Sequence, residues 1–193
     1  MNKTHLPAPS CRNPWSRKKR TVAYENKWMR LNHDAVIRPD GNPGVYGVVH
    51  YYNKSVGIVA INSSNQVLLV GQYRYTIDRF SWEIPAGGCP ENETPLATAH
   101  RELEEETGYT TPSMRLLLHA HMSNSISDEE GFCFLAGELN PGNASPEGTE
   151  DLRKTWLDFD EALHVIQSGE ITDALTILAL QQAAVLRKTN NPG

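Results

Sequence analysis

The segment NETPLATAHRELEEETG, residues 92–108, constrains the fold most strongly because it carries the signals of both a helix start and a helix end. Thr94 is a suitable N-cap, Pro95 suits the first helical position, and Gly108 suits the position just beyond the last turn. The sequence therefore predicts a helix over residues 95–107.

The predicted helix has two different faces because successive residues advance by about 100°. One face is expected to pack on the core, and it carries Leu96, Ala99, Leu103 and Thr107. The other face carries Glu102, Glu105 and Glu106, whereas Glu104 points away from these three. Carboxylates three or four positions apart on a helix repel each other, so a cation is expected against them.

The acidic face has two interpretations. Mg²⁺ prefers oxygen ligands and usually combines a few carboxylates with waters and substrate phosphates, which suits this face. The alternative is a solvated acidic surface, which is the commoner role of a bare glutamate run on a helix. The longer pattern around the helix favours the metal site.

Glycine and charged residues follow a fixed spacing around this helix. Gly87 is followed after five residues by Glu93, and after seven more by the segment RELEEETG. This pattern resembles the signature box of the Nudix hydrolases over residues 87–109, at every fixed charged and glycine position. Tyr109 is the one departure, since a branched aliphatic residue is usual there.

The residues of the box have physical roles that suit a metal site. A predicted strand ends at Ile84 and enters the segment PAGG, where glycines let the backbone approach a metal or a phosphate and leave a carbonyl available as a ligand. Arg101 lies one turn before Glu105 and can hold a glutamate in one rotamer. The alternative for Arg101 is a plain surface ion pair.

Length and composition limit the classes of protein. The 193 residues suffice for one domain with an extension, and the net charge of −5 argues against nucleic-acid or anionic-membrane partners. No apolar run reaches the length of a membrane span, and the basic N-terminus lacks a secretory signal, so a cytoplasmic location is expected. The three cysteines favour reduced thiols over a disulfide framework, and they are Cys11, Cys89 and Cys133.

The chain is expected to contain four segments. Residues 1–19 read as a flexible basic arm, and residues 20–55 as a β-rich extension for dimerisation and base binding. Residues 56–189 form the predicted hydrolase domain, and residues 190–193 a short tail.

Three strands and then two helices are predicted after the box. Strands are predicted over residues 114–120, 131–139 and 153–157, and helices over residues 159–167 and 172–188. This order predicts an α/β fold, an α/β/α sandwich with a mixed sheet and an N-terminal β-rich extension. The Nudix resemblance implies the same architecture.

The sequence on either side of the box resembles one branch of the Nudix family. The segments VLLVGQYRYTIDRFSWEIPAGG and SGEITDALTILAL, together with YENKWMRL, are similar to the ADP-ribose pyrophosphatase and nucleoside diphosphate sugar hydrolase branch. The resemblance extends over residues 21–182. It implies a homodimer, because such N-terminal extensions exchange between subunits in this branch.

The resemblance implies the metal ligands position by position. They are the backbone carbonyl of Ala86 and the carboxylates of Glu102 and Glu106, with Glu105 close beside them. The metal expected is Mg²⁺, with Mn²⁺ as an alternative ion.

The resemblance also implies contacts with substrate. Arg74 would contact the diphosphate or the sugar beyond it, since arginine suits bidentate phosphate recognition. Glu83 would contact either the substrate or Arg74. Trp28 matches a position that stacks on the base, with a core or interface tryptophan as the alternative.

The general base is expected on a loop well after the box. The segment NASPEGTEDLRKTW supplies Glu147, Glu150 and Asp151. Glu150 aligns best and is assigned to a catalytic metal or to positioning of water, and Glu147 is the second candidate. A solvated acidic loop is the alternative.

The loop HMSNSISDEEGF departs from the pattern of ADP-ribose specialists, which usually carry a proline there. This departure favours a broader specificity for nucleoside diphosphate sugars. The loop then supplies candidates for contacts with the sugar or its phosphate, unless it is only a hydrophilic turn: Ser125, Ser127, Asp128 and Glu129.

The sequence thus predicts a Mg²⁺-dependent hydrolase that cleaves the pyrophosphate of nucleoside diphosphate sugars, including ADP-ribose, into a nucleoside monophosphate and a sugar phosphate. The expected partners are that substrate and a second copy of the chain, with no nucleic acid and no membrane. Two alternatives remain open, a preference for GDP-mannose and a non-catalytic sugar-nucleotide sensor. A sensor would be expected to lose box glutamates, whereas this sequence keeps them.

Overall fold

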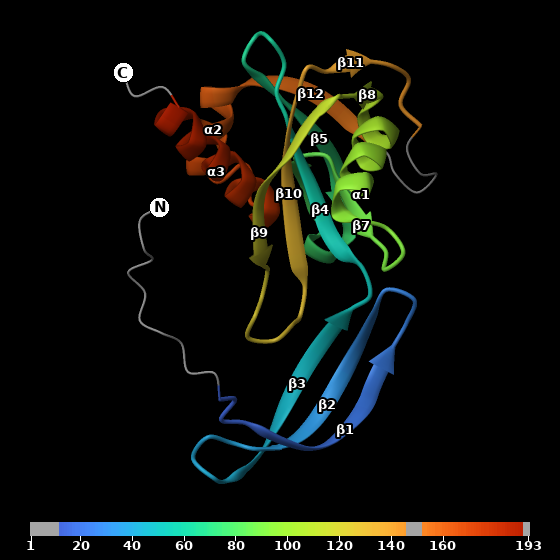
Figure 1. Cartoon of the computed structure of the whole chain (residues 1–193), viewed down its shortest axis with the longest axis vertical. Helices are drawn as coiled ribbons and strands as arrows, with labels where there is room; N and C mark the ends of the chain where they lie inside the picture. The colour runs from blue at the N-terminus through green and yellow to red at the C-terminus, as the bar shows by residue number, and fades with distance from the viewer. Residues whose placement is uncertain (1–11, 146–151, 191–193) are drawn as a thin grey trace. The chain divides into compact units, whose positions relative to one another are not determined.

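The chain divides after His50 into two units, Met1–His50 and Tyr51–Gly193 (Figure 1). The computed structural model describes residues 12–145 and 152–190. The division lies earlier than the boundary expected between residues 55 and 56.

The N-terminal unit is built on three strands, β1 (Ser16–Glu25), β2 (Met29–Ile37) and β3 (Pro43–Tyr51), with β2 in the middle. β1 and β2 are antiparallel and pair from Ser16 opposite Ile37. The flexible arm expected over residues 1–19 was therefore too long, because residues 16–19 belong to β1. Basic side chains on an edge strand extend into solvent while their backbone joins the sheet, so composition concealed the strand.

One face of β2 is buried and polar. Asn32 and Asp34 are buried together with Val36, in the alternation that a strand imposes. Arg20 on β1 donates two hydrogen bonds to the Asp34 carboxylate, at 2.7 and 2.6 Å. This bidentate pair lowers the pKa of Asp34, chiefly through the hydrogen bond.

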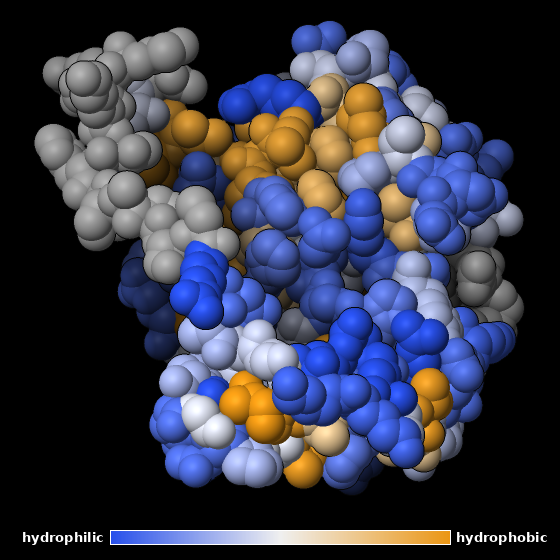
Figure 2. Space-filling model, turned by 60° about the horizontal axis from the view of Figure 1, so that its bottom comes forward, coloured by the Kyte–Doolittle hydropathy of each residue, from blue (hydrophilic) through white to orange (hydrophobic). Residues whose placement is uncertain are grey.

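The N-terminal unit also exposes large apolar side chains, which are Trp15, Val22, Tyr24, Trp28 and Val45. The molecular face in Figure 2 carries hydrophobic patches separated by hydrophilic side chains. Where such side chains form one contiguous patch, they mark a surface that contacts another protein.

The described part of the second unit contains two larger sheets and one two-stranded pair. The first has the order β7-β4-β10-β9, from β4 (Lys54–Ala60), β7 (Ala86–Cys89), β9 (Ser113–His121) and β10 (Glu130–Gly137). β4 and β10 are parallel and the other pairs are antiparallel, so this sheet is mixed. The second is antiparallel with the order β12-β5-β6, from β5 (Gln66–Arg74), β6 (Arg79–Glu83) and β12 (Arg153–Asp158). A short pair joins β8 (Tyr109–Thr110) to β11 (Asn140–Pro141), and a 3-10 turn, η1 (Tyr75–Ile77), links β5 to β6.

Helices cover both faces of the mixed sheet (Figure 1). Val56 and Ile58 on β4 pack with Ala99 and Leu103, on the side of α1 (Pro95–Glu102). Val59, the next residue along β4, packs on the other side, where the core includes α2 (Phe159–Gln167) and α3 (Ala174–Asn190). The layered α/β sandwich predicted from the sequence is confirmed.

The box helix extends over the predicted residues. Thr94 caps α1 by accepting a hydrogen bond from the Ala97 amide at 3.2 Å, and Gly108 ends it in the left-handed conformation, with φ of 81°. The last turn, η2 (Leu103–Thr107), is π-helical. Leu96 is 43% exposed, so its assignment to the core was wrong, because the first turn projects beyond the core.

The two C-terminal helices also begin and end as predicted, to within two residues. Gly169, with φ of 82°, follows α2, and the Asp173 side chain accepts from the Thr176 amide at 2.8 Å where α3 begins. Cys89 and Cys133 are buried free thiols, whereas Cys11 lies outside the described residues. None of the helices in residues 12–145 and 152–190 combines the length and apolar character needed to cross a membrane.

Asp34→Asn should lower the free energy of unfolding by about 1–3 kcal/mol at pH 7, because it removes a charge-assisted pair. The folded-state pKa of Asp34 lies below its ordinary value of 3.8. The stabilisation is thus complete above that value and is lost as pH falls through the lower folded pKa. Urea unfolding between pH 7 and pH 2.5 measures this.

Asp40→Asn is the matched control, since the Asp40–Arg38 pair is largely exposed. It should change the free energy of unfolding little at any pH. A constant difference between wild type and Asp34→Asn across the pH range would contradict the assignment.

Candidate active site

The site is organised by the outer edge of β7. Ile58 donates its amide hydrogen to the Pro85 carbonyl at 2.8 Å, and the next pair along the two strands is Gly57 opposite Ala86. Hydrogen-bonded and non-hydrogen-bonded pairs alternate in an antiparallel ladder, so the backbone groups of Ala86 point away from β4. Its amide donates instead to the Glu106 carboxylate, at 3.0 Å.

The first glutamate of the acidic face lies against the same edge. A Cβ at Gly87 would overlap the carboxylate of Glu102, so only glycine allows this approach. Glu102 and Glu106 are 8% and 2% exposed. Two buried carboxylates therefore lie beside the backbone of residues 86–87. The approach of this backbone to a metal or a phosphate stays a prediction.

Arg101 balances the charge of these carboxylates. Its guanidinium lies 2.8 Å from Glu102 and 2.9 Å from Glu105, and it also donates to Glu93 at 3.1 Å. The pKa of Arg101 is raised, first by the hydrogen bond to Glu93 and then by those to the other carboxylates. The pKa of Glu93 is lowered by Arg101 and by the Thr98 hydroxyl. Arg101 thus contacts Glu105, and the orienting role expected of it stays a prediction, whereas the contact with Glu93 was not foreseen.

The oxygen donors of this site suit a hard divalent cation. Glu102 lies against Gly87, and Glu106 accepts the Ala86 amide. These two carboxylates and the Ala86 carbonyl all offer oxygen. Within the residues that the structure describes, no three side chains of His, Cys, Asp or Glu converge as a metal site by themselves. Waters and substrate phosphates usually complete such a site.

Arg74 and Glu83 form a second charged pair on neighbouring strands. Arg74 donates to the two carboxylate oxygens of Glu83, at 2.9 and 2.5 Å, and Glu83 is buried. The pKa of Arg74 is raised, first by this hydrogen bond and further by the charges of Asp173 and Glu106. Glu83 was expected to contact either the substrate or Arg74, and in the structure it pairs with Arg74.

This pair lines a cleft of about 400 Å³ between β6 and the start of α3. On the far wall, Thr172 accepts a hydrogen bond from Arg79 at 2.6 Å, and Asp173 accepts from the Thr176 hydroxyl at 2.7 Å. Ile84 donates its amide to Thr176 at 3.0 Å, which ties α3 to the strand end that leads to Ala86. The sequence analysis recognised the motif SGEITDALTILAL but assigned no role to these residues.

The loop between β9 and β10 is attached to the start of β4. Asp128 accepts the Tyr51 amide at 3.0 Å, and Glu129 accepts the Ser55 hydroxyl at 2.9 Å. Burial raises the pKa of Tyr51, and the charge of Glu129 adds to the effect. Asp128 and Glu129 thus hold the loop in place, and the substrate contacts expected from them and from Ser127 stay predictions.

The structure leaves three expected site residues untested. Glu147 and Glu150 lie outside the described residues. Trp28 belongs to the N-terminal unit and is 61% exposed, with the Lys27 ammonium 4.3 Å from its ring centroid. Its exposure excludes a core role within that unit.

Comparison with known proteins identifies the family. The sequence model of the NUDIX domain matches residues 51–176, which is more than half of the chain. This chain belongs to the Nudix family of hydrolases. Residues 15–49 match a separate model, the nucleoside diphosphate sugar hydrolase N-terminal domain. The Nudix resemblance inferred from the box is confirmed. Nudix hydrolases generally use divalent metal ions, which agrees with the oxygen donors beside β7.

Curated Nudix relatives align over most of the chain. A Bacillus subtilis protein named ADP-ribose pyrophosphatase is 32% identical over 172 residues, 86% of this chain and 92% of its own. A Bacillus methanolicus protein named methanol dehydrogenase activator is 32% identical over 160 residues, 82% of this chain and 86% of its own. A Yersinia pestis GDP-mannose pyrophosphatase is 28% identical over 171 residues, 82% of this chain and 86% of its own.

A solved structure supports the same fold. The crystal structure of an ADP compounds hydrolase superposes with a TM-score of 0.85, over 96% of this chain and all of the other. At 16% identity the likeness concerns the fold alone.

Glu106→Gln should abolish most hydrolytic activity, by about 100-fold or more, and weaken divalent-metal binding. The amide oxygen of glutamine can still accept the Ala86 amide, so the melting temperature should change little. Steady-state kinetics, metal titration and thermal melting measure the three effects.

Glu104→Gln is the matched control, because Glu104 is exposed on the other side of the same helix. It should leave activity and metal affinity close to wild type. Near-normal turnover of Glu106→Gln at saturating metal would remove Glu106 from the metal site.

Proposed function

We propose that this chain is a Mg²⁺-dependent hydrolase that cleaves the pyrophosphate of nucleoside diphosphate sugars, including ADP-ribose, into a nucleoside monophosphate and a sugar phosphate. The observation that carries this proposal is the pair of buried carboxylates, Glu102 and Glu106, placed against the backbone of Ala86 and Gly87. The names of the curated relatives and the match of the N-terminal unit support the class of substrate.

The residues that would hold the metal are Glu102, Glu106 and the Ala86 carbonyl, with Glu105 beside them and Glu150 as a further ligand. Bound Mg²⁺ would neutralise the diphosphate and make attacking water more acidic, and Mn²⁺ has the same preference for oxygen. Arg101 keeps Glu105 oriented and offsets the repulsion among the glutamates. Glu150, or in second place Glu147, accepts the proton of the attacking water.

Arg74 is the residue proposed to bind the diphosphate or the sugar beyond it. It reaches the cleft of about 400 Å³ with its guanidinium fixed by Glu83. A guanidinium held in this way loses little conformational freedom when it binds a phosphate. Glu83 therefore acts on the substrate through Arg74, as a positioning residue.

Two alternatives remain for the substrate and the activity. A GDP-mannose preference is compatible with the relative of that name. A non-catalytic sugar-nucleotide sensor is disfavoured because a sensor would be expected to lose box glutamates, whereas this chain keeps Glu102, Glu105 and Glu106.

A panel of nucleoside diphosphate sugars distinguishes these alternatives. Phosphate release in a coupled phosphatase assay, with Mg²⁺, with Mn²⁺ and with a chelator, reports hydrolysis and its metal requirement. We expect Mg²⁺-dependent hydrolysis of ADP-ribose and of several other members of the panel. No hydrolysis of any member, with binding retained, would establish the sensor instead, and turnover of GDP-mannose alone would establish that preference.

The N-terminal unit is proposed to build a homodimer. Its exposed apolar side chains and its match to a separate domain model are the observations behind this proposal. Light scattering at micromolar concentration should give about twice the 21.5 kDa of one chain. A mass equal to one chain would contradict it.

Trp28 is proposed to stack on the base of the substrate. Trp28→Ala should raise KM roughly ten- to a hundred-fold, for a loss of about 1–3 kcal/mol, with a smaller change in kcat. Since every base has a π-face, the factor should be similar for ADP-ribose and for other nucleoside diphosphate sugars. An unchanged KM across the panel would remove Trp28 from the site.

A further inference from the structure

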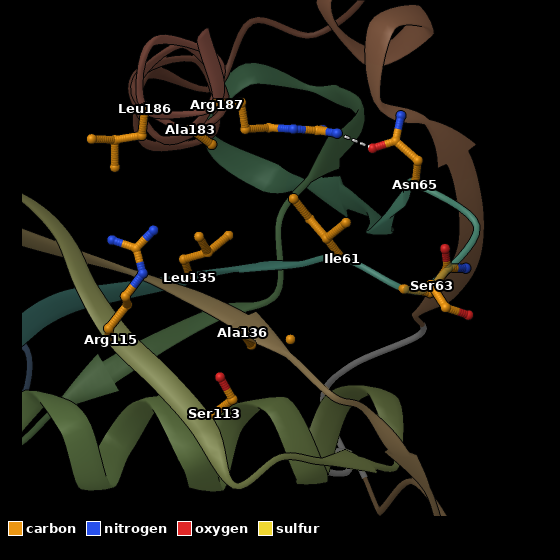
Figure 3. A pocket seen from close by; sticks show the side chains of 12 residues that line it. Ile61, Ser63, Asn65, Ser113, Arg115, Leu135, Ala136, Ala183, Leu186 and Arg187 are labelled. Carbon is orange, nitrogen blue, oxygen red and sulfur yellow. Dashed lines mark hydrogen bonds between the residues drawn. The ribbon is translucent and has the colours of Figure 1, made fainter. Parts of the chain in front are cut away.

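A cavity of about 410 Å³ lies away from every residue of the proposed active site. It is lined by the turn between β4 and β5, the beginning of β9, the end of β10, and the last turns of α3 (Figure 3). α3 packs on the opposite side of the mixed sheet from α1 and the turn η2, which together carry the glutamates of the proposed metal site. The volume falls within the range of small-molecule sites.

Two arginines from different elements give this cavity its charge. Arg115 projects from β9 and Arg187 from α3 (Figure 3). The Arg187 guanidinium donates to the Asn65 side chain and lies 4.3 Å from the centroid of the Phe159 ring, so its position is fixed. Arg115 takes part in no ion pair within the described part of the chain. No carboxylate is among the described lining residues, although the chain carries a net charge of −5.

The rest of the lining combines hydroxyl groups with an apolar wall. Ser63 and Ser113 contribute hydroxyls, and Leu135, Ala183 and Leu186 contribute the apolar surface. Guanidinium and hydroxyl donors together suit the oxygens of a phosphate, and the apolar wall suits the organic part of a ligand.

An adjoining groove indicates the nature of that organic part. The groove measures about 590 Å³ and shares the residues of the β4–β5 turn with the cavity. It is lined by Tyr109 and Trp156, whose ring centroids are 5.5 Å apart in an edge-to-face arrangement. Tyr109 is the one residue that departs from the box pattern, and aromatic side chains are the usual partners of nucleic-acid bases.

We propose that this cavity is a second ligand site, which binds the phosphate of a nucleotide on Arg115 and Arg187. The base extends along the adjoining groove toward Tyr109 and Trp156. Because the site lies across the sheet from α1, a nucleotide can occupy it independently of the catalytic glutamates. The proposal does not depend on the substrate of the active site.

The test is a titration of the full-length ¹⁵N-labelled protein with AMP, followed by NMR in the presence of a metal chelator. We expect shifts of the amides of Ser113, Arg115 and Gly137. Arg115→Glu should weaken the affinity reported by these amides at least ten-fold. Lys188→Glu is the matched control, since Lys188 is exposed one residue beyond Arg187 and does not line the cavity; it should bind as wild type does.

Adenosine and inorganic phosphate separate the two parts of the ligand, and each should bind at least ten-fold more weakly than AMP. Equal affinity for adenosine would overturn the phosphate contact, and equal affinity for inorganic phosphate would overturn the nucleotide assignment. Shifts confined to residues 74–106, or an affinity unchanged by Arg115→Glu, would overturn the site. Arg115→Gln provides a neutral substitute, with the same expected loss, and thermal melting verifies the fold of each variant.

Discussion

The hydrogen bond from the Ala86 amide to Glu106 joins the edge of the mixed sheet to the end of the box helix. It forms because the ladder to β4 leaves the backbone groups of Ala86 on the outer side of β7. The Glu102 carboxylate lies against the same edge beside Gly87, where a Cβ would overlap it. Every other feature of the candidate metal site depends on this contact between strand and helix.

Burial of two carboxylates is costly unless opposite charge or hydrogen bonds compensate for it. In this site the compensation comes from Arg101 and from the backbone amide of residue 86. Arg101 is itself held by Glu93, which lies just before the helix, so the guanidinium cannot move freely toward solvent. A divalent cation would add the positive charge that several glutamates on one helical face require.

The mixed sheet separates two regions with different chemistry. On the side of α1 lie the glutamates, and on the side of α3 lies the cavity with Arg115 and Arg187. The cleft at Arg74 lies where β6 meets the start of α3. Residues 84–85 join Glu83, the partner of Arg74, to Ala86 at the outer edge of β7, and the Ile84 amide is bound to Thr176 of α3. Only a few residues of chain separate Glu83 from Ala86. A substrate bound to Arg74 would therefore lie near the Glu102 and Glu106 carboxylates.

The box helix, its caps and its acidic face were predictable from the sequence because they depend on residues close together in the chain. Spacing sets the angle between side chains on a helix, so the grouping of Glu102, Glu105 and Glu106 follows from their positions alone. Family resemblance added Arg74 and Glu83, which do form a pair. Leu96 was misassigned because a helical stripe does not tell how far the core extends beneath it.

Tertiary structure alone decided the contacts between distant segments. Thr172 and Asp173 enter the Arg74 cleft because α3 packs against the end of β6, and the Ile84–Thr176 hydrogen bond spans 92 positions in the chain. Arg115 and Arg187 likewise share a cavity only because a strand and a helix from different parts of the sequence pack together. Sequence determines which side chains share a face of one element. Only packing determines which faces of different elements meet, since burial and hydrogen bonding over the whole molecule are optimised together.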